Sequence, residues 1–197
     1  MPCTMGHMDE RAACILDGGS AEGVPSEVAL ARLVDVLTAR GWSPTTYRAR
    51  DLEVSPCRGC FACWVKTPGV CIIDDVAREI VRTVAQSALL VLVTPVTFGG
   101  YSSELKKMID RLIPLILPYF TFVGREVHHI RRYPRYASLL GVGLLPRPDP
   151  KQEKVFRSLV RRNSINFHAP ETEVCFVYGD GTEGETSLAE GLAEVIG

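Results

Sequence analysis

Ala88-Leu-Leu-Val-Leu-Val-Thr94 is the clearest β-strand in this sequence, and the expected architecture follows from it. Its residues are apolar at consecutive positions, so both faces of the strand are expected to be buried. That pattern is typical of a central strand in a parallel sheet with helices on both sides. The segment therefore predicts a protein of the α/β class.

Around this strand, short apolar runs alternate with segments of helical period. Strands are expected at residues 12–17, 43–50, 88–94, 137–145 and 173–178. Helices are expected at 26–40, from 74–75 to about 87, from 102 or 103 to 114, from 149 to about 166, and at 187–196, with 115–136 irregular. With right-handed crossovers, this alternation predicts a doubly wound, five-stranded parallel sheet in a three-layer sandwich.

The length and composition indicate one globular domain over residues 11–197. The chain has 197 residues, of which 46% are hydrophobic and 23% charged, as is ordinary for a soluble domain of this size. Residues 1–10 are expected to be a disordered N-terminal segment or a tag remnant, since Gly6-His7-Met8 resembles a cloning scar.

The charge and the N-terminus exclude several classes of partner and compartment. A net charge of −1 gives no electrostatic reason to bind nucleic acid or an anionic membrane. The longest apolar run, 88–93, is far shorter than the roughly 20 residues needed to span a bilayer. The first residues lack a secretory signal, and seven cysteines do not fit a secreted disulfide framework. A cytoplasmic protein is expected.

The first candidate binding loop is Gly18-Gly-Ser-Ala-Glu-Gly-Val-Pro-Ser26, between the first strand and the first helix. Ligands of open parallel sheets bind beyond the carboxyl ends of the strands. Small residues let the backbone approach a ligand, the hydroxyls of Ser20 and Ser26 can donate, and a helix N-terminus favours phosphate. The loop has neither the dinucleotide nor the P-loop fingerprint. A plain glycine-rich turn with a serine cap is the alternative.

The second candidate loop follows the central strand. It combines a rigid proline, apolar and aromatic walls, and glycines that expose backbone N–H groups, as a site for a flat heteroaromatic ring requires. The alternative is an ordinary strand–helix connection, but its place directly after the most buried strand favours a site. The candidate residues are Pro95, Val96, Thr97, Phe98, Gly99 and Gly100.

The third candidate is a cysteine-rich loop at residues 55–73. It contains a C-x2-C-x2-C-x7-C motif, in which the two-residue gaps let thiolates converge and a Pro68-Gly69 turn can return the last one. The spacing suits an iron–sulfur cluster, a zinc ion or a redox dithiol. Cysteines without metal, either free or in a reversible disulfide, are the alternative. The candidate ligands are Cys57, Cys60, Cys63 and Cys71.

These segments together resemble the flavodoxin-like NAD(P)H-dependent FMN reductase superfamily, and within it most closely the iron–sulfur flavoproteins. The residues that carry the resemblance are Gly19-Ser20 with Ser26, the cysteine motif ending in Cys71-Ile-Ile-Asp-Asp75, and 94–111, which contains Pro-Val-x-Phe-Gly, Leu-Lys and Asp-Arg. The resemblance covers most of residues 12–180 and is strongest from 55 to 113. It implies a sheet in the order 2-1-3-4-5 and a homodimer or homotetramer.

The resemblance also implies where FMN binds. Its phosphate would lie against Ser20, Glu22 and Ser26, and its isoalloxazine ring would rest on residues 95–100. Glu22 stands where relatives often carry a basic residue, and Thr97 stands where they often carry an aromatic one.

The function implied is FMN-dependent redox chemistry. The protein would be an NAD(P)H-dependent flavin or quinone-type oxidoreductase, or an iron–sulfur flavoprotein that passes electrons between FMN and a nearby [4Fe–4S] cluster on the four cysteines. No catalytic side chain is expected, since the flavin performs the chemistry. Its partners would be a small-molecule electron donor or acceptor, or a redox protein. A non-enzymatic electron carrier and a zinc-stabilised or cofactor-free binding module are the alternatives.

Overall fold

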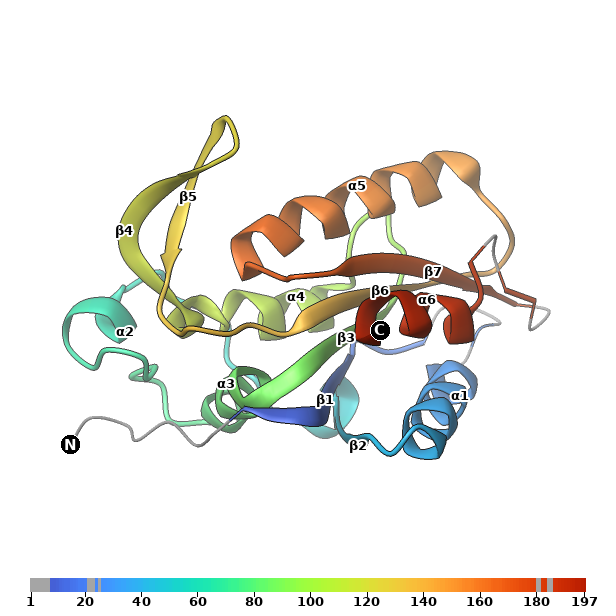
Figure 1. The fold of residues 1–197 in the computed structure, drawn as a ribbon, viewed down its shortest axis with the longest axis horizontal. Coiled ribbons are helices and arrows are strands. Elements are labelled where there is room, and N and C mark those ends of the chain that lie inside the picture. The colour runs from blue at the N-terminus through green and yellow to red at the C-terminus, as the bar shows by residue number, and fades with distance from the viewer. Residues whose placement is uncertain (1–7, 21–23, 25, 180–181, 184–185) are drawn as a thin grey trace.

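The structure is a computed structural model that describes residues 8–20, 24, 26–179, 182–183 and 186–197. Its centre is a parallel sheet of five strands in the order β2-β1-β3-β6-β7. Because β4 and β5 lie outside this sheet, β6 and β7 are its fourth and fifth strands, and the order is the expected 2-1-3-4-5. The strands are β1 (Asp9–Asp17), β2 (Ser43–Arg48), β3 (Ser87–Pro95), β6 (Ser138–Leu145) and β7 (Thr172–Tyr178). The doubly wound architecture expected from the sequence is confirmed (Figure 1).

The apolar strand β3 lies in the middle of the sheet. It pairs with β1 on one side and β6 on the other, with Leu92 opposite Gly141. Residues 89–93 are each at most 2% exposed, so both faces of the strand are covered. β1 begins at Asp9, three residues earlier than expected, and Asp9 pairs with Ser87 of β3.

Helices cover the two faces of the sheet. One hydrophobic layer contains α1 (Ser26–Ala39) and α6 (Leu188–Ile196), and the other contains α3 (Ala77–Gln86), α4 (Ser103–Asp110) and α5 (Pro150–Phe167). Adjacent strand residues point to opposite layers, as Ile15 and Leu16 do. Figure 1 shows α5 on one side of the sheet and α1 and α6 on the other.

Three helices begin with a side chain that caps their first turn. The side chains of Ser102 and Asp149 accept bonds from N–H groups in the first turns of α4 and α5. Ser187 forms a capping box with Glu190 at the start of α6. Each cap satisfies donors that the first turn of a helix leaves free.

Residues 115–136 correct the sequence prediction, because this segment is not irregular. It contains an antiparallel hairpin of β4 (Ile116–Val123) and β5 (Glu126–Arg131), in which Phe122 lies opposite Val127. Gly124, with φ +61, lies in the turn. Aromatic and β-branched residues on both sides of a glycine indicate a hairpin. The interspersed basic residues hid that pattern.

Short helices complete the chain at η1 (Ala49–Asp51), α2 (Ala62–Val65) and η2 (Ile113–Leu115). The helix expected up to Pro114 therefore ends at Asp110, and Pro114 lies in η2, near its start. Figure 1 shows the hairpin projecting from one end of the molecule, next to α2. Within the described ranges, no helix is long and apolar enough to cross a membrane.

Candidate functional site

The polar groups of the first loop gather around Asp17, the last residue of β1. Asp17 is 1% exposed, and its carboxylate accepts hydrogen bonds from the N–H of Gly19 at 2.9 Å and the hydroxyl of Ser26 at 3.1 Å. Ser20 Oγ accepts the N–H of Ser26 at 2.9 Å. The structure thus brings Ser20 and Ser26 together at the start of α1, and directs the Ser26 hydroxyl towards a carboxylate.

Charged residues surround this loop. Glu27 in the first turn of α1 forms an ion pair with Arg50 of η1. A hydrogen bond to its own backbone and the bond to Arg50 lower the pKa of Glu27. Glu22 lies outside the described residues. Two carboxylates, Asp17 and Glu27, therefore lie close to the first loop, together with the cation Arg50.

Ser102 joins the first loop to the second. Its hydroxyl donates to the carbonyl oxygen of Gly18 at 2.8 Å, and its N–H donates to Thr94 Oγ1 at 2.9 Å. A Cβ at Gly18 would lie 2.6 Å from both Leu105 Cβ and Ser102 Oγ. Only glycine permits this approach, so the two loops lie against each other at the carboxyl edge of the sheet.

The second loop forms a tight turn over residues 97–100. Thr97 and Gly100 exchange two backbone hydrogen bonds of 3.0 and 2.8 Å, and the central residues have positive φ, +52 at Phe98 and +77 at Gly99. These are the marks of a type I′ turn, in which a non-glycine residue at Phe98 is unusual. The Phe98 side chain is 96% exposed. A flat aromatic ring is therefore presented at the tip of this loop.

Both flanks of the turn are anchored. Pro95 ends β3, and the N–H of Val96 donates to the carbonyl of Leu144 in β6 at 3.0 Å. Gly99 is buried against Val155 of α5. Neither the N–H group of Phe98 nor that of Gly99 has a hydrogen-bond partner among the described residues.

The cysteine loop folds around α2. Cys63 is buried on this short helix, Cys57 and Cys60 are exposed, and Cys71 is half-buried. The N–H of Val70 donates to the carbonyl of Thr67, which closes a turn at Pro68-Gly69. That turn returns the chain towards the other thiols.

The four thiols lie in one neighbourhood. Burial raises the pKa of Cys63, and the charges of Cys71, Cys57 and Cys60, in that order, raise it further. Among the described residues, however, no three histidine, cysteine or carboxylate side chains are placed as ligands of one metal ion. Thiols are the donors that such a metal or cluster uses, but a bound group would need the loop to bring at least three of them together.

A buried ion pair, which the sequence did not reveal, closes the base of this loop. Arg111, 2% exposed, donates to both carboxylate oxygens of Asp75 at 2.7 and 2.8 Å and to the carbonyl of Ser55 at 2.7 Å. Burial tends to raise the pKa of Asp75, but the bonds from Arg111 and from the Ser55 N–H outweigh it and lower that pKa. One guanidinium therefore ties both ends of the cysteine loop to the end of α4.

Aromatic contacts connect the cysteine loop to the hairpin. The Trp64 indole N–H donates to the carbonyl of Ile116 at 2.9 Å. Its ring lies 5.1 Å from the ring of Phe61 and 4.9 Å from that of His129, and His129 lies 4.6 Å from Phe120. The hairpin therefore packs against α2, in the middle of the cysteine motif.

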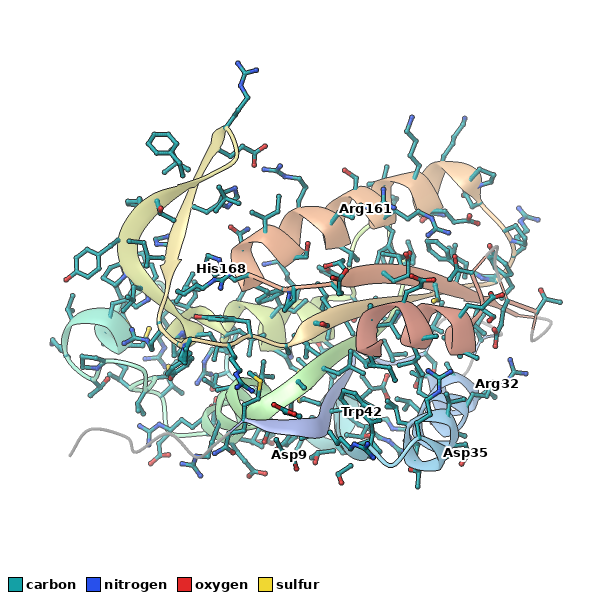
Figure 2. All side chains as sticks on the ribbon, viewed as in Figure 1. Asp9, Arg32, Asp35, Trp42, Arg161 and His168 are labelled. Atoms are coloured by element: carbon teal, nitrogen blue, oxygen red, sulfur yellow. The ribbon has the colours of Figure 1, made fainter. Side chains whose placement is uncertain are left out.

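Histidines attach the hairpin to α5. The buried His128 ring lies between Glu126 Oε2, at 3.0 Å, and Asn166 Oδ1, at 2.9 Å. His168 Nε2 is 2.8 Å from the carbonyl oxygen of His129, and Figure 2 shows His168 at the end of α5 that faces the hairpin. The hairpin is thus held from two sides, by α2 and by α5.

The cysteine loop and the first loop lie far apart within one chain. In Figure 1, α2 and the hairpin are at one end of the longest axis, and α1 is at the other. The second loop follows both the first loop and the cysteine loop in the sequence, and α4 leads from it to Arg111 at the base of the cysteine loop.

A doubly wound sheet in this order, with two adjoining loops at the carboxyl edge of its first and third strands, defines a flavodoxin-like protein. Residues 15–127, more than half of the chain, match the family model described as NADPH-dependent FMN reductase. The chain belongs to that family.

Individual relatives agree with this assignment. An iron–sulfur flavoprotein of Methanosarcina thermophila is 29% identical over 100 residues, which is 51% of each chain. An iron–sulfur flavoprotein of Methanocaldococcus jannaschii is 42% identical over 65 residues, 33% of each chain. The matches thus span about half or less of these curated relatives. The NAD(P)H:quinone oxidoreductase of Methanothermobacter marburgensis has the same fold, with TM-score 0.63, 11% identity and 88% of each chain covered.

Proposed function

We propose that this protein is an FMN-dependent oxidoreductase that takes electrons from NADH or NADPH. Membership of the FMN reductase family supports the cofactor. The observation that carries the proposal is the type I′ turn at 97–100, which presents an exposed aromatic ring and two unbonded N–H groups next to the first loop. Bound FMN would supply the hydride and electron chemistry.

The residues of the two loops would bind and orient the cofactor. Ser20, Glu22 and Ser26 lie in the loop proposed to meet the phosphate, at the start of α1, where backbone N–H groups and the helix dipole favour an anion. Arg50 is the cation beside that loop. Residues 95–100 would carry the ring, with the N–H groups of Phe98 and Gly99 facing its polar edge.

FMN titration of a variant with an added negative charge in the first loop tests where the phosphate binds. Ser20→Glu adds a carboxylate to the first loop and should weaken FMN binding by at least about tenfold, since like charges repel. Ser43→Glu, which adds the same charge at an exposed position in β2, should bind as the wild type does. Flavin fluorescence measures the affinity, and NADH and NADPH oxidation by the loaded protein measures the activity. Equal FMN affinity in the two variants would reject the phosphate assignment.

We propose that the four loop cysteines bind a [4Fe–4S] cluster, which would exchange single electrons with a redox protein. The thiolate donor set and the names of the curated relatives support this, and a structural zinc is the alternative for the same ligands. Iron, sulfide and zinc should be measured on protein purified without oxygen. About four irons per chain are expected, lost in Cys63→Ser and retained in Cys14→Ala, which removes a buried thiol of β1. Zinc without iron would favour the structural ion.

We also propose that the protein is a cytoplasmic homodimer or homotetramer. Large hydrophobic side chains are exposed along the hairpin and on α2, among them Tyr119, Phe120, Phe122, Val127 and Val65. A second copy would cover this surface, and free thiols such as Cys57 and Cys60 suit a reducing compartment. Light scattering should give two or four chains for the wild type and a smaller mass for Phe122→Ser. A monomeric wild type would reject the assembly.

A further inference from the structure

The helix α5 is strongly basic, although the chain as a whole is close to neutral. It carries five cations and a single carboxylate, whereas the net charge of the chain is −1. Lys154, Arg157, Ser158 and Arg161 have the i, i+3, i+4, i+7 spacing that places side chains on one face of a helix. Positive charge that is concentrated on one face attracts an anionic ligand.

These four side chains line a groove of about 440 Å³ on α5. Figure 2 shows the position of Arg161 on the helix. The volume is in the range of sites for small organic ligands. Apart from Pro150, the lining consists of charged or hydroxyl-bearing side chains. Such a lining suits phosphate groups, to which arginine can donate paired, charge-assisted hydrogen bonds.

Two of the cations in the groove are free to meet a ligand. Arg157 and Arg162 already have protein partners, which are a backbone carbonyl of β7 and the carboxylate of Glu126. No hydrogen bond or ion pair among the described residues uses the side chain of Lys154 or Arg161. At a rise of about 1.5 Å per residue, these two positions are about 10 Å apart along the helix. They can therefore meet two separate anionic groups of one ligand.

The single carboxylate in the lining makes the two ends of the groove different. Glu153 Oε1 accepts the hydroxyl of Tyr178 at 3.0 Å and the N–H of Asp149 at 2.9 Å, so it is held at the start of α5. Its charge opposes an anion at the Lys154 end. The attraction for an anion is therefore strongest at the Arg161 end, which suits the more highly charged group of a ligand.

The groove begins next to the proposed ring site. A Cβ at Gly99 would lie 2.5 Å from Val155 Cγ1, so the second loop packs against the turn of α5 that also carries Lys154. An electron donor whose reacting ring lay at the second loop would have its nearer phosphates at Lys154. A group further along the same molecule would lie towards Arg161.

We propose that this groove binds the phosphates of the dinucleotide electron donor, with the pyrophosphate at Lys154 and the 2′-phosphate of NADPH at Arg161. This inference rests on the proposed function and deepens it, because it makes NADPH the preferred donor. NADH carries a hydroxyl in place of the 2′-phosphate, so it would leave the charge of Arg161 without an anionic partner.

Steady-state kinetics of the FMN-loaded protein separate the two contacts. Arg161→Gln should raise the KM for NADPH about tenfold and leave the KM for NADH and both kcat values unchanged, because one charge-assisted contact is lost. Lys154→Gln should raise both KM values. Arg82→Gln, which removes another exposed cation, on α3, is the matched control and should behave as the wild type does. The same KM for NADPH in Arg161→Gln and Arg82→Gln overturns the proposal.

A calorimetric titration with adenosine 2′,5′-bisphosphate tests the groove without flavin chemistry. This probe should bind the wild type and Arg82→Gln about tenfold more tightly than Arg161→Gln, whereas adenosine 5′-phosphate should not distinguish the three proteins. Equal affinity of the bisphosphate for Arg161→Gln and Arg82→Gln overturns the proposal. Absence of binding to the wild type also overturns it, and would favour an acidic protein surface as the partner of this face.

The two experiments distinguish failure of this inference from failure of the proposed function. A wild type that oxidises neither NADH nor NADPH contradicts the proposed function, and the bisphosphate titration still decides whether the groove binds phosphate. Steady NADPH oxidation with the same KM in Arg161→Gln and the control leaves the proposed function standing and rejects the groove.

Discussion

The hydroxyl of Ser26 donates to the carboxylate of Asp17 at 3.1 Å, at the start of the loop where we propose that the FMN phosphate binds. The carboxylate helps to shape the loop, since it also accepts the N–H of Gly19. Its charge opposes an anion at the same place. These two effects of Asp17 act in opposite directions on FMN affinity, and a neutral substitution separates them.

Asp17→Asn should tighten FMN binding by about fivefold, the equivalent of about 1 kcal/mol, because it removes a buried negative charge next to the phosphate. It should also lower the free energy of unfolding by about 1 kcal/mol, since the amide cannot accept both hydrogen bonds equally well. Flavin fluorescence titrations and urea unfolding measure the two effects.

The matched control is Asp35→Asn, which removes the same charge from an exposed position on α1 (Figure 2). It should change neither quantity. Weaker FMN binding in Asp17→Asn would show that the shape of the loop, rather than its charge, dominates affinity at this position.

Gly99→Ala should damage the second loop more than Gly124→Ala damages the hairpin turn. Both glycines have positive φ, +77 and +61, so alanine costs about 1 kcal/mol at either position from backbone strain. At Gly99 the new Cβ would also lie 2.5 Å from Val155 Cγ1, whereas nothing lies within 4 Å at Gly124. Crowding of this kind costs about 1–3 kcal/mol more.

Because Gly99 is also in the proposed ring site, its substitution should weaken FMN binding while Gly124→Ala leaves it unchanged. Urea unfolding and flavin titration of the two variants measure this. Equal FMN affinity in both would argue that the turn at 97–100 does not contact the flavin.

The sequence predicted the sheet well because local patterns decide its elements. The apolar run of β3 marks the central strand, and the expected starts of α4, α5 and α6 lie within one residue of the observed ones. The hairpin at 116–131 was missed because His128, His129 and Arg131 interrupt its apolar residues. Burial of His128 depends on Asn166 and Glu126, which no local pattern encodes.

The candidate site was predictable only in part, for a similar reason. The candidate loops and the cysteine motif are contiguous in sequence, so their residue types were visible together. The contact of Arg111 with Asp75 joins residues 36 positions apart, so no local sequence pattern encodes it. From the sequence, Asp17 was expected only to be the last residue of a strand. Its hydrogen bond with Ser26 could not be predicted, because it depends on the path of the loop between them.

Trp64→Phe should loosen the cysteine loop. The substitution keeps an aromatic ring but removes the indole N–H that donates to Ile116, a bond worth about 1 kcal/mol. Local opening should become about fivefold more frequent, and Cys63, 8% exposed, should be alkylated faster by about that factor in metal-free protein.

Mass spectrometry of alkylated peptides measures the rate at Cys63. Trp42→Phe is the matched control, because Trp42 packs against the opposite layer of the sheet, with α1 and α6. It should leave the rate at Cys63 unchanged. Equal rates in Trp64→Phe and the wild type would show that the hairpin does not restrain the loop.

Glu126 should make the attachment of the hairpin to α5 sensitive to acid. Hydrogen bonds from Arg162 and then His128 lower the pKa of Glu126 from its ordinary value of 4.5 to about 2. A carboxylate whose pKa is lowered on folding stabilises the protein fully above its unfolded pKa, and that contribution is lost as the pH falls through the folded value. The window here extends from about pH 4.5 down to about pH 2.

Glu126→Gln removes this titration, so the melting temperature of the wild type should exceed that of the variant above pH 4.5. The difference between them should shrink towards zero as the pH approaches 2. Glu194→Gln, at an exposed position on α6, should follow the wild type throughout. Melting curves of the three proteins at half-unit steps from pH 7 to 2 measure the effect. A difference between wild type and Glu126→Gln that does not vary with pH would mean that the glutamate acts by packing or hydrogen bonding alone, and that its charge does not hold the hairpin.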